Sequence, residues 1–217
     1  MFDFHVALES TPLLLSAAKM TLFVSVVGLV VGFVIAVMVA SASLSSSPLL
    51  RRITSWYVFV FRGIPLLVQL MVVFYFLPVI GINVPPLVAA IVAISLCEGA
   101  YIGEILRGGF MGIPKGQLEA TQLLGMSRFT TVVRIQVPQA LRLTMPALIN
   151  EMIMLVKASS LISIVGVTEL TRMAQNIAAS TFAPMEAYLG AAFVYFLING
   201  VLSVIGYWAE RHYGRMA

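Results

Sequence analysis

The sequence predicts an all-α membrane protein with five transmembrane helices, and composition and hydropathy carry this prediction. Of the 217 residues, 60% are hydrophobic and 10% are charged, whereas about a quarter of the residues in soluble domains are charged. The mean hydropathy is +1.02. Apolar stretches long enough to cross a bilayer, about 20 residues each, recur along the chain between polar turns. The length fits a single domain, residues 1–217, with a core over about 15–209.

The five predicted spans cover residues 11–43, 55–77, 87–106, 141–165 and 187–209. The first is long for a bilayer, so we expect it to tilt or to extend beyond the surface. Gly63 and Pro65 interrupt the second span, where the proline should kink the helix. The segment between the last two spans, residues 166–186, is partly polar, and we expect a short surface helix there.

Positive charges set the predicted orientation, because Lys and Arg are enriched in cytoplasmic loops. One set of loops holds most of them: Arg51, Arg52, Arg107, Lys115, Arg128, Arg134, Arg142, Arg211 and Arg215. The opposite set holds Lys19 and Arg172. With five spans, this bias places the N-terminus outside and the C-terminus in the cytoplasm. The segment between the third and fourth spans, residues 112–138, is then cytoplasmic. The net charge of +4 reflects these loops, and no nucleic-acid partner is expected.

Two short helices joined by an elbow are predicted within this cytoplasmic segment. Residues 117–124 favour a first helix, and Gly125 ends it because glycine adopts a positive φ without strain. Ser127 can N-cap a second helix that runs to Ile135. Pro138 closes the unit and begins the next span, since its missing N–H would be unpaired in a first turn anyway. A helix–elbow–helix at a membrane surface is suited to docking into a partner.

The spacing of this segment resembles the EAA loop of ABC importer permeases, which reads Glu-Ala-Ala, three residues, Gly, nine residues, Ile, one residue, Leu-Pro. Here Glu119-Ala120-Thr121 is followed at the same spacings by Gly125, Ile135 and Pro138. Thr121 and Val137 are mild departures from the pattern. The runs FRGIPLLVQ and EILRGGFMGIPKGQ look like the polar amino acid (histidine/glutamine-type) branch of that family. The alternative is an ordinary interhelical loop.

The resemblance implies the type I ABC importer permease fold (MetI-like) and uptake of a polar amino acid or close relative across the bacterial inner membrane. Eight residues would dock the ATPase: Glu119, Ala120, Thr121, Gly125, Met126, Ser127, Ile135 and Pro138. The implied partners are two ABC ATPase subunits, a second permease chain (a copy or a paralogue), an extracytoplasmic substrate-binding protein and membrane lipid.

The chain itself is not expected to be an enzyme. It has no Gly-x4-Gly-Lys-Ser/Thr pattern for phosphate binding, so ATP and Mg would be bound by the partner ATPase. We expect no catalytic, cofactor or metal site in this chain. An ion-coupled secondary carrier stays open as an alternative, although such carriers typically contain inverted repeats and none is visible. A non-transporting membrane scaffold also stays open, but it leaves the predicted docking segment without a role.

Ionisable residues inside apolar spans are functional candidates, since each is costly in a bilayer. Glu151 lies about ten residues into the fourth span, which is about 15 Å along a helix and near the midplane of a core about 30 Å thick. Transporter sites lie near this depth. The candidate substrate-binding residues are therefore Glu151, Asn150, Arg62 and Glu98. The Glu151 carboxylate is suited to an α-amino group or a cationic side chain.

Structural roles compete with this interpretation. Glu151 could instead hydrogen-bond between helices or between subunits. Arg62 could form an ion pair with Glu104, or Glu104 could pair with Arg107, three residues further on. Lys157, near the end of the fourth span, can extend its amine to the membrane surface or hold helix ends together.

Overall fold

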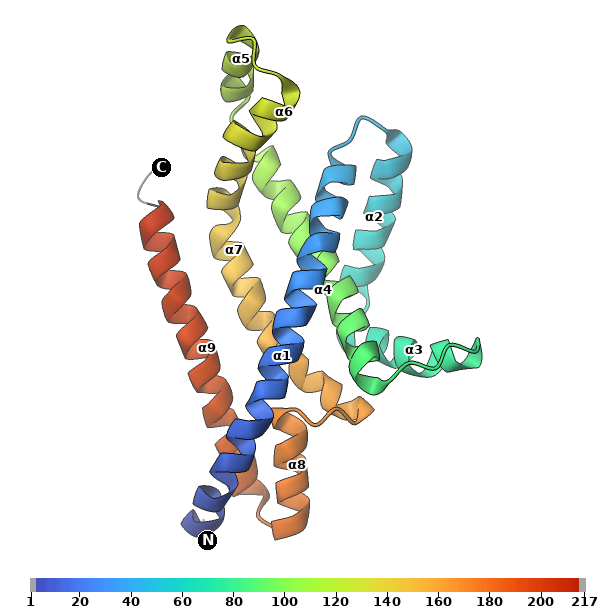
Figure 1. Cartoon of the computed structure of the whole chain (residues 1–217), viewed down its shortest axis with the longest axis vertical. Helices are drawn as coiled ribbons and strands as arrows, with labels where there is room; N and C mark the ends of the chain where they lie inside the picture. The colour runs from blue at the N-terminus through green and yellow to red at the C-terminus, as the bar shows by residue number, and fades with distance from the viewer. Residues whose placement is uncertain (1–2, 215–217) are drawn as a thin grey trace.

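The computed structural model describes residues 3–214, and these residues are helical with no strand (Figure 1). Four helical stretches are long and apolar enough to cross a membrane: Phe4–Ser43, Pro86–Met111, Arg128–Val165 and Pro184–Arg211. A fifth crossing exists if the bent pair Pro48–Gly63 and Leu66–Val79 counts as one span. The all-α membrane fold is thus confirmed. The predicted number of five spans is reached when the bent pair is counted as one span. Arg215, used above for the orientation, lies outside the described residues.

Helix α1 (Phe4–Ser43) begins earlier than the predicted first span and runs for 40 residues. At 1.5 Å per residue it is about 60 Å long, roughly twice the hydrocarbon thickness of a bilayer. Asp3 caps its start, since the Asp3 carboxylate accepts a hydrogen bond from the His5 backbone N–H at 2.9 Å. The length of α1 agrees with the expectation that the first span tilts or extends beyond the surface.

Small residues let α1 pack closely along helix α4 (Pro86–Met111). A Cβ added at Gly28 would lie 2.5 Å from Ile94 Cγ2, and one added at Gly32 would lie 2.7 Å from Glu98 Cβ. Glycines at such contacts bring two helix backbones together, as is common in membranes. This packing places Glu98 in the protein interior, against the backbone of α1.

The predicted kink in the second span is a sharp break between two helices. Helix α2 (Pro48–Gly63) and helix α3 (Leu66–Val79) meet at 101°. Residues 55–77 therefore do not form the one kinked helix that the sequence predicted. In Figure 1, α2 runs alongside α1 and α4, whereas α3 turns sideways from the end of α2. Helix α3 still packs against α4.

Gln69 explains why the chain can break so sharply at Pro65. Pro65 has no N–H to give to the Phe61 carbonyl, four residues earlier. The buried Gln69 side-chain amide donates to the Phe61 carbonyl at 2.8 Å and to the Ile64 carbonyl at 2.7 Å. Buried carbonyls without a partner are costly, so Gln69 stabilises the break by supplying the missing donors.

The predicted helix–elbow–helix forms at one end of the molecule (Figure 1). Its first helix is α5 (Lys115–Leu123). The elbow follows at Gly125, whose φ is +66°. The Ser127 hydroxyl accepts a hydrogen bond from the Thr130 backbone N–H at 3.2 Å and so caps α6 (Arg128–Thr131). The predicted helix end at Gly125 and the predicted cap at Ser127 are both present.

The second helix does not end at Ile135, as the sequence predicted, because it is continuous with the fourth span. A π-helical turn, η1 (Val132–Gln136), joins α6 to helix α7 (Val137–Ala158). Pro138 lies in the first turn of α7. A π-helical turn already interrupts the usual i→i−4 hydrogen bonding, so the missing N–H of Pro138 breaks no regular helix at that position. The second helix of the elbow and the fourth span therefore form one helical stretch, Arg128–Val165.

The opposite end of the molecule is built from three further elements. The 3₁₀ segment η2 (Ser159–Val165) ends at Gly166, whose φ is +86°. Helix α8 (Leu170–Thr181) follows and is the short helix expected within residues 166–186. Helix α9 (Pro184–Gly214) then returns along the molecule toward the end that carries α5 and α6 (Figure 1).

Glu169 joins these elements as the N-cap of α8, and it is fully buried. Its Oε1 accepts a hydrogen bond from the Arg172 backbone N–H at 2.8 Å. Its Oε2 accepts from the Thr171 backbone N–H at 2.9 Å and from the Tyr195 hydroxyl of α9 at 2.8 Å. The Thr21 hydroxyl of α1 donates to the same oxygen at 3.5 Å. One carboxylate thus connects α1, α8 and α9.

Candidate substrate site and docking surface

Three helices bring ionisable side chains together within the membrane-spanning part of the molecule. Helix α4 packs against α1, α2 and α7, and supplies Glu98, while α2 supplies Arg62 and α7 supplies Glu151. The carboxylates of Glu98 and Glu151 repel each other electrostatically, and the Arg62 guanidinium attracts Glu151. Three of the four candidate substrate residues therefore form one cluster, although they are far apart in the sequence.

Glu98 is the most buried member of this cluster, with 4% of its surface exposed. Its Oε2 is buried and has no hydrogen-bond partner among the described residues. An unpaired polar atom in a protein interior costs about 1–3 kcal/mol, and more for a charged group. The Glu98 carboxylate therefore has unused capacity to accept a hydrogen bond from a cationic ligand.

Arg62 lies in the last turn of α2, over an aromatic ring of α4. Its guanidinium carbon is 5.1 Å from the centroid of the Tyr101 ring, within the range of a cation–π interaction. The sequence allowed an ion pair between Arg62 and Glu104. The structure instead pairs Glu104 with Arg107, whose Nε lies 3.0 and 3.1 Å from the two carboxylate oxygens. Arg107 is one turn away on the same helix and reaches Glu104 without crossing to another.

Two other polar residues of the fourth span lie at its surface. Asn150 is exposed, and its side chain makes no hydrogen bond to a described residue. Since consecutive residues of a helix point about 100° apart, Asn150 does not share the direction of Glu151. Lys157 is exposed in the last turn of α7, which leaves its amine free to extend.

Polar groups missed by the sequence analysis contact α4 beside Leu96 and Cys97, the residues that precede Glu98. The Gln69 Oε1 is buried and also has no partner among the described residues. The Gln69 amide lies 4.0 Å from the Cys97 sulfur, next to Glu98 in the chain. The Tyr57 hydroxyl donates to the Leu96 carbonyl at 2.5 Å. In the sequence, the position of Gln69 four residues after the helix-breaking Pro65 could have indicated its role.

The motif residues of the elbow divide into exposed and buried groups. Glu119 and Ala120 are exposed, while Thr121 is buried and bonds its hydroxyl to the Leu118 carbonyl at 2.8 Å. The Met126 backbone N–H donates to the Thr121 carbonyl at 3.0 Å and closes the turn around Gly125. Thr121 therefore shapes the elbow, and Glu119 and Ala120 remain free to meet a partner.

Large apolar side chains surround the elbow, and the sequence analysis did not single them out. Leu123 is 90% exposed, Leu124 is 77% exposed and Phe129 is 78% exposed. Of the remaining motif residues, Ile135 is half-buried and Pro138 is exposed. Apolar residues at the tip of an otherwise polar loop were the signal that could have identified this surface. These three side chains, Leu123, Leu124 and Phe129, are candidates for contact with a partner, and we refer to them together as the docking surface.

These features define a class of protein before any comparison: a multi-span helical membrane protein with a capped helix pair that protrudes from one end. The family model for the binding-protein-dependent transport system inner membrane component matches residues 12–215. The chain belongs to this family of inner-membrane permease components. It is therefore an inner-membrane protein of a transport system.

The chain is similar to named members of this family over nearly its whole length. It is 38% identical to the glutamine transport system permease protein GlnP of Escherichia coli (strain K12), over 94% of each chain. It is 38% identical to the L-cystine transport system permease protein TcyB of Bacillus subtilis (strain 168), over 94% of this chain and 88% of that one. Its fold matches a crystal structure of an amino acid ABC transporter with histidines, with a TM-score of 0.92, 33% identity and coverage of 98% and 99%. The predicted type I permease fold is thus confirmed.

Proposed function

We propose that this chain is the permease subunit of an ATP-driven importer for a polar amino acid or a close relative. The observation that carries the proposal is the match over 98% of the chain to an amino acid ABC transporter. The names of the permeases GlnP and TcyB assign them glutamine and L-cystine, two substrates that share the α-amino and α-carboxylate groups. The proposed substrate class is defined by that shared zwitterion.

The proposed assembly contains two ATPase subunits, a second permease chain and an extracytoplasmic substrate-binding protein. ATP and Mg would be held by the ATPase subunits, which would contact the docking surface. Leu123, Leu124 and Phe129 supply exposed apolar area for such a contact. Phe129 and Glu151 lie on one continuous helical stretch, so movement of an ATPase against Phe129 would be transmitted along this helix to the candidate substrate site.

The proposed site binds a zwitterion by charge complementarity. The carboxylates of Glu98 and Glu151 would receive the substrate ammonium, and the Arg62 guanidinium would receive its carboxylate. The unpaired Glu98 Oε2 supports this role, since a substrate ammonium would supply the missing donor. Asn150 is included among the proposed substrate residues only because it is next to Glu151 in the sequence.

The proposed orientation has the N-terminus outside and the docking surface in the cytoplasm. The positive charge of the loops at the docking end supports it. A cysteine introduced at Ser46 or Ser127 should resist a membrane-impermeant thiol reagent in intact cells, whereas one at Asn83 should be labelled. Native Cys97 is buried, so it should add little background. Labelling at Ser127 from outside would overturn the orientation.

The function is tested by ATP-driven uptake into proteoliposomes that contain the permease chains, the ATPase subunits and the binding protein. We expect uptake of a labelled amino acid that requires both ATP and the binding protein. Uptake driven by an ion gradient without ATP would favour the secondary carrier. Assembly without uptake of any amino acid under either condition would favour the scaffold.

A glycine pair tests the docking segment within the same assay. Gly125 has a φ of +66°, which a valine reaches only with strain of about 1–3 kcal/mol. Gly125→Val should therefore distort the elbow and lower ATPase association or stimulated hydrolysis, with the chain still in the membrane. Gly116→Val is the matched control, since Gly116 lies in α5 and no atom within 4 Å would meet its Cβ. Uptake by Gly125→Val equal to that of the wild type and of Gly116→Val would show that the elbow is not needed.

A further inference from the structure

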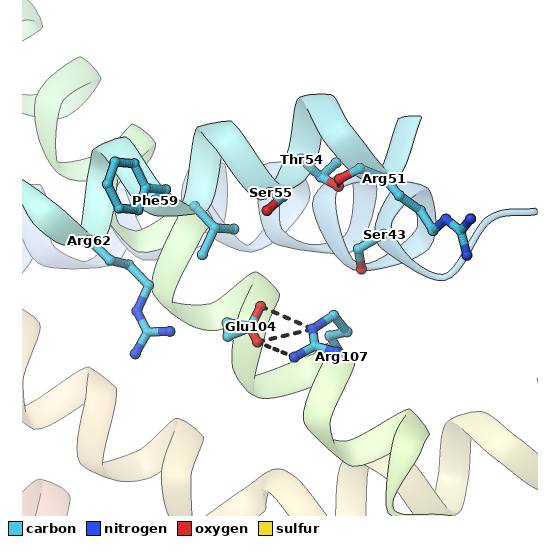
Figure 2. A pocket seen from close by; sticks show the side chains of 9 residues that line it. Ser43, Arg51, Thr54, Ser55, Phe59, Arg62, Glu104 and Arg107 are labelled. Atoms are coloured by element: carbon cyan, nitrogen blue, oxygen red, sulfur yellow. Dashed lines mark hydrogen bonds and ion pairs between the residues drawn. The ribbon is translucent and has the colours of Figure 1, made fainter. Parts of the chain in front are cut away.

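An arginine-rich cavity of about 420 Å³ lies beside the candidate substrate site, between the end of α1, helix α2 and helix α4 (Figure 2). The charged residues of its lining are Arg51, Arg62, Glu104 and Arg107. Arg62 belongs both to this cavity and to the cluster with Glu151. From Arg62 back to Arg51, α2 covers about 16 Å, toward the end of the molecule that carries the docking surface (Figure 1). The cavity therefore extends from the candidate site toward that end.

The cavity has an excess of positive charge. It contains three guanidinium groups and one carboxylate, Glu104, and Arg107 already binds that carboxylate. Arg51 and Arg62 form no ion pair with any carboxylate in the part of the chain that the structure describes. In Figure 2, Arg62 and Arg107 flank Glu104 from opposite sides. A concave surface with charge of one sign raises the local concentration of counter-ions, so this cavity attracts anions.

We propose that Arg62, Arg107 and Arg51 form an anion subsite that receives the carboxylate of the substrate as it leaves the Glu98–Glu151 cluster toward the docking end. The subsite rests on the proposed function, because it assumes a zwitterionic substrate. It adds Arg107 and Arg51 to the substrate path and gives the order in which the substrate carboxylate meets the arginines. Arg62 is the innermost guanidinium and Arg51 lies nearest the end of the span.

A carboxylate fits these groups better than a neutral ligand does. The planar guanidinium offers paired N–H donors that match the two oxygens of a carboxylate. Because Arg62 and Arg51 lie about 16 Å apart along α2, one carboxylate contacts them in succession rather than together. Because Glu104 already pairs with Arg107, Arg107 binds the substrate carboxylate only weakly. The substrate carboxylate can therefore dissociate from the subsite.

The experiment measures how strongly the importer prefers an acid to its amide. The whole importer is purified without nucleotide or binding protein, and dissociation constants are measured for L-arginine and its α-amide and for L-glutamine and its α-amide. Within each pair the side chain is the same, and a mildly acidic buffer keeps the α-amino group protonated in both, so that only the carboxylate differs. The ratio of the amide Kd to the acid Kd therefore reports contacts with the carboxylate.

We expect the wild-type importer to prefer the acid and Arg62→Gln to reduce that preference about tenfold or more, as for a lost charge-assisted hydrogen bond. Arg51 is exposed, so Arg51→Gln should reduce the ratio only about two- to threefold because of solvent screening. Glu104→Gln should raise the ratio, since it releases Arg107. In that background Arg107→Gln should abolish the gain. This gain of preference is a result that a misfolded variant cannot give.

Arg52→Gln is the matched control, because Arg52 is exposed on the same helix but does not line the cavity. Its acid-to-amide preference should equal that of the wild type. A lowered ratio in Arg62→Gln with unchanged ratios in the Arg51 and Glu104 variants would overturn the subsite while leaving the proposed function, which includes Arg62, intact. Loss of a bound anionic phospholipid from these variants, measured by mass spectrometry with unchanged ratios, would assign the cavity to a lipid phosphate instead. A wild-type importer that binds and transports no amino acid would overturn the proposed function itself.

Discussion

Glu98 and Glu169 are both buried glutamates, yet their surroundings differ completely. Glu169 is fully buried at the junction of α1, α8 and α9, and both of its oxygens accept hydrogen bonds. Glu98 is 4% exposed, and its Oε2 has no partner among the described residues. The charge facing Glu98 is that of another carboxylate, Glu151, whereas Glu169 is surrounded by donors.

This difference shows that burial of a charge does not by itself distinguish a structural residue from a binding residue. A buried carboxylate with its acceptors filled holds elements together, since removing it leaves several donors unpaired. A buried carboxylate with an unfilled acceptor is costly in isolation and becomes favourable only when a cation arrives. The comparison therefore assigns Glu169 to the structure and Glu98 to the proposed substrate site.

The largest expected effect comes from removing the filled carboxylate. Glu169→Leu leaves the Thr171 and Arg172 backbone N–H groups without their acceptor in the interior, at about 1–3 kcal/mol for each group. We expect a clear fall in yield and in the Tm of the purified importer. The control is Glu9→Leu at an exposed position of α1, which should leave Tm unchanged. An unaltered Tm in Glu169→Leu would contradict the structural role and remove the contrast with Glu98.

The second prediction is that substitution of Glu98 weakens substrate binding and leaves stability unchanged. Glu98→Gln keeps the size of the side chain and removes its repulsion with Glu151, so assembly and Tm should be preserved. Loss of a charge-assisted hydrogen bond to a substrate ammonium should weaken binding roughly tenfold or more. The measurement is the substrate Kd and the uptake rate, beside a size-exclusion profile. Glu151→Gln should have a smaller effect in the same direction, since Glu151 is only half-buried.

Two outcomes at Glu98 would change the interpretation. Full binding and uptake by an intact Glu98→Gln importer would exclude Glu98 from the substrate site. A dissociated importer would instead place Glu98 with Glu169 among the structural carboxylates. Glu98→Gln and Glu169→Leu must therefore be compared under the same conditions, with yield, Tm and uptake measured for each.

The sequence predicted most of the helices because hydropathy is a local property. It also predicted the elbow, since Gly125 and Ser127 act through their own backbone and their near neighbours. It did not predict the 101° break between α2 and α3, because a proline permits a kink or a break and the carbonyls that it exposes need a donor. That donor is Gln69, which also contacts Cys97 on another helix.

The carboxylates illustrate the same limit within the site. Intramembrane charge identified Glu98, Glu151 and Arg62 as candidates, but not their mutual arrangement, which depends on how α2, α4 and α7 pack. The role of Glu169 was not predicted at all. Its partner Thr21 lies 148 residues away in the chain, and such a contact leaves no local pattern. Sequence spacing also could not show that Pro138 continues a helix, because the preceding π-helical turn is set by the packed structure.

The smallest expected effect is on the pH dependence of stability, and it concerns Glu169. Burial raises the pKa of the Glu169 carboxyl above its ordinary value, against the opposing effect of its hydrogen bonds. Between the ordinary pKa of about 4.3 and the raised one, the folded state holds a proton that the unfolded state has released. The stabilisation from this group is therefore complete below about pH 4.3 and is lost as pH rises through the raised pKa, by at most about 1.4 kcal/mol per pH unit.

Glu169→Gln tests this prediction, since an amide does not titrate. We expect the Tm of the wild-type importer to fall relative to that of Glu169→Gln as pH is raised from about 4.3 toward neutrality. Glu119→Gln, at an exposed position of α5, should follow the wild type at every pH and is the control. Parallel curves for the wild type and Glu169→Gln would show that Glu169 has the same pKa in the folded and unfolded chain. A wild-type Tm that rises relative to the variant would mean that the hydrogen bonds outweigh burial, because a lowered pKa stabilises the folded state as pH increases.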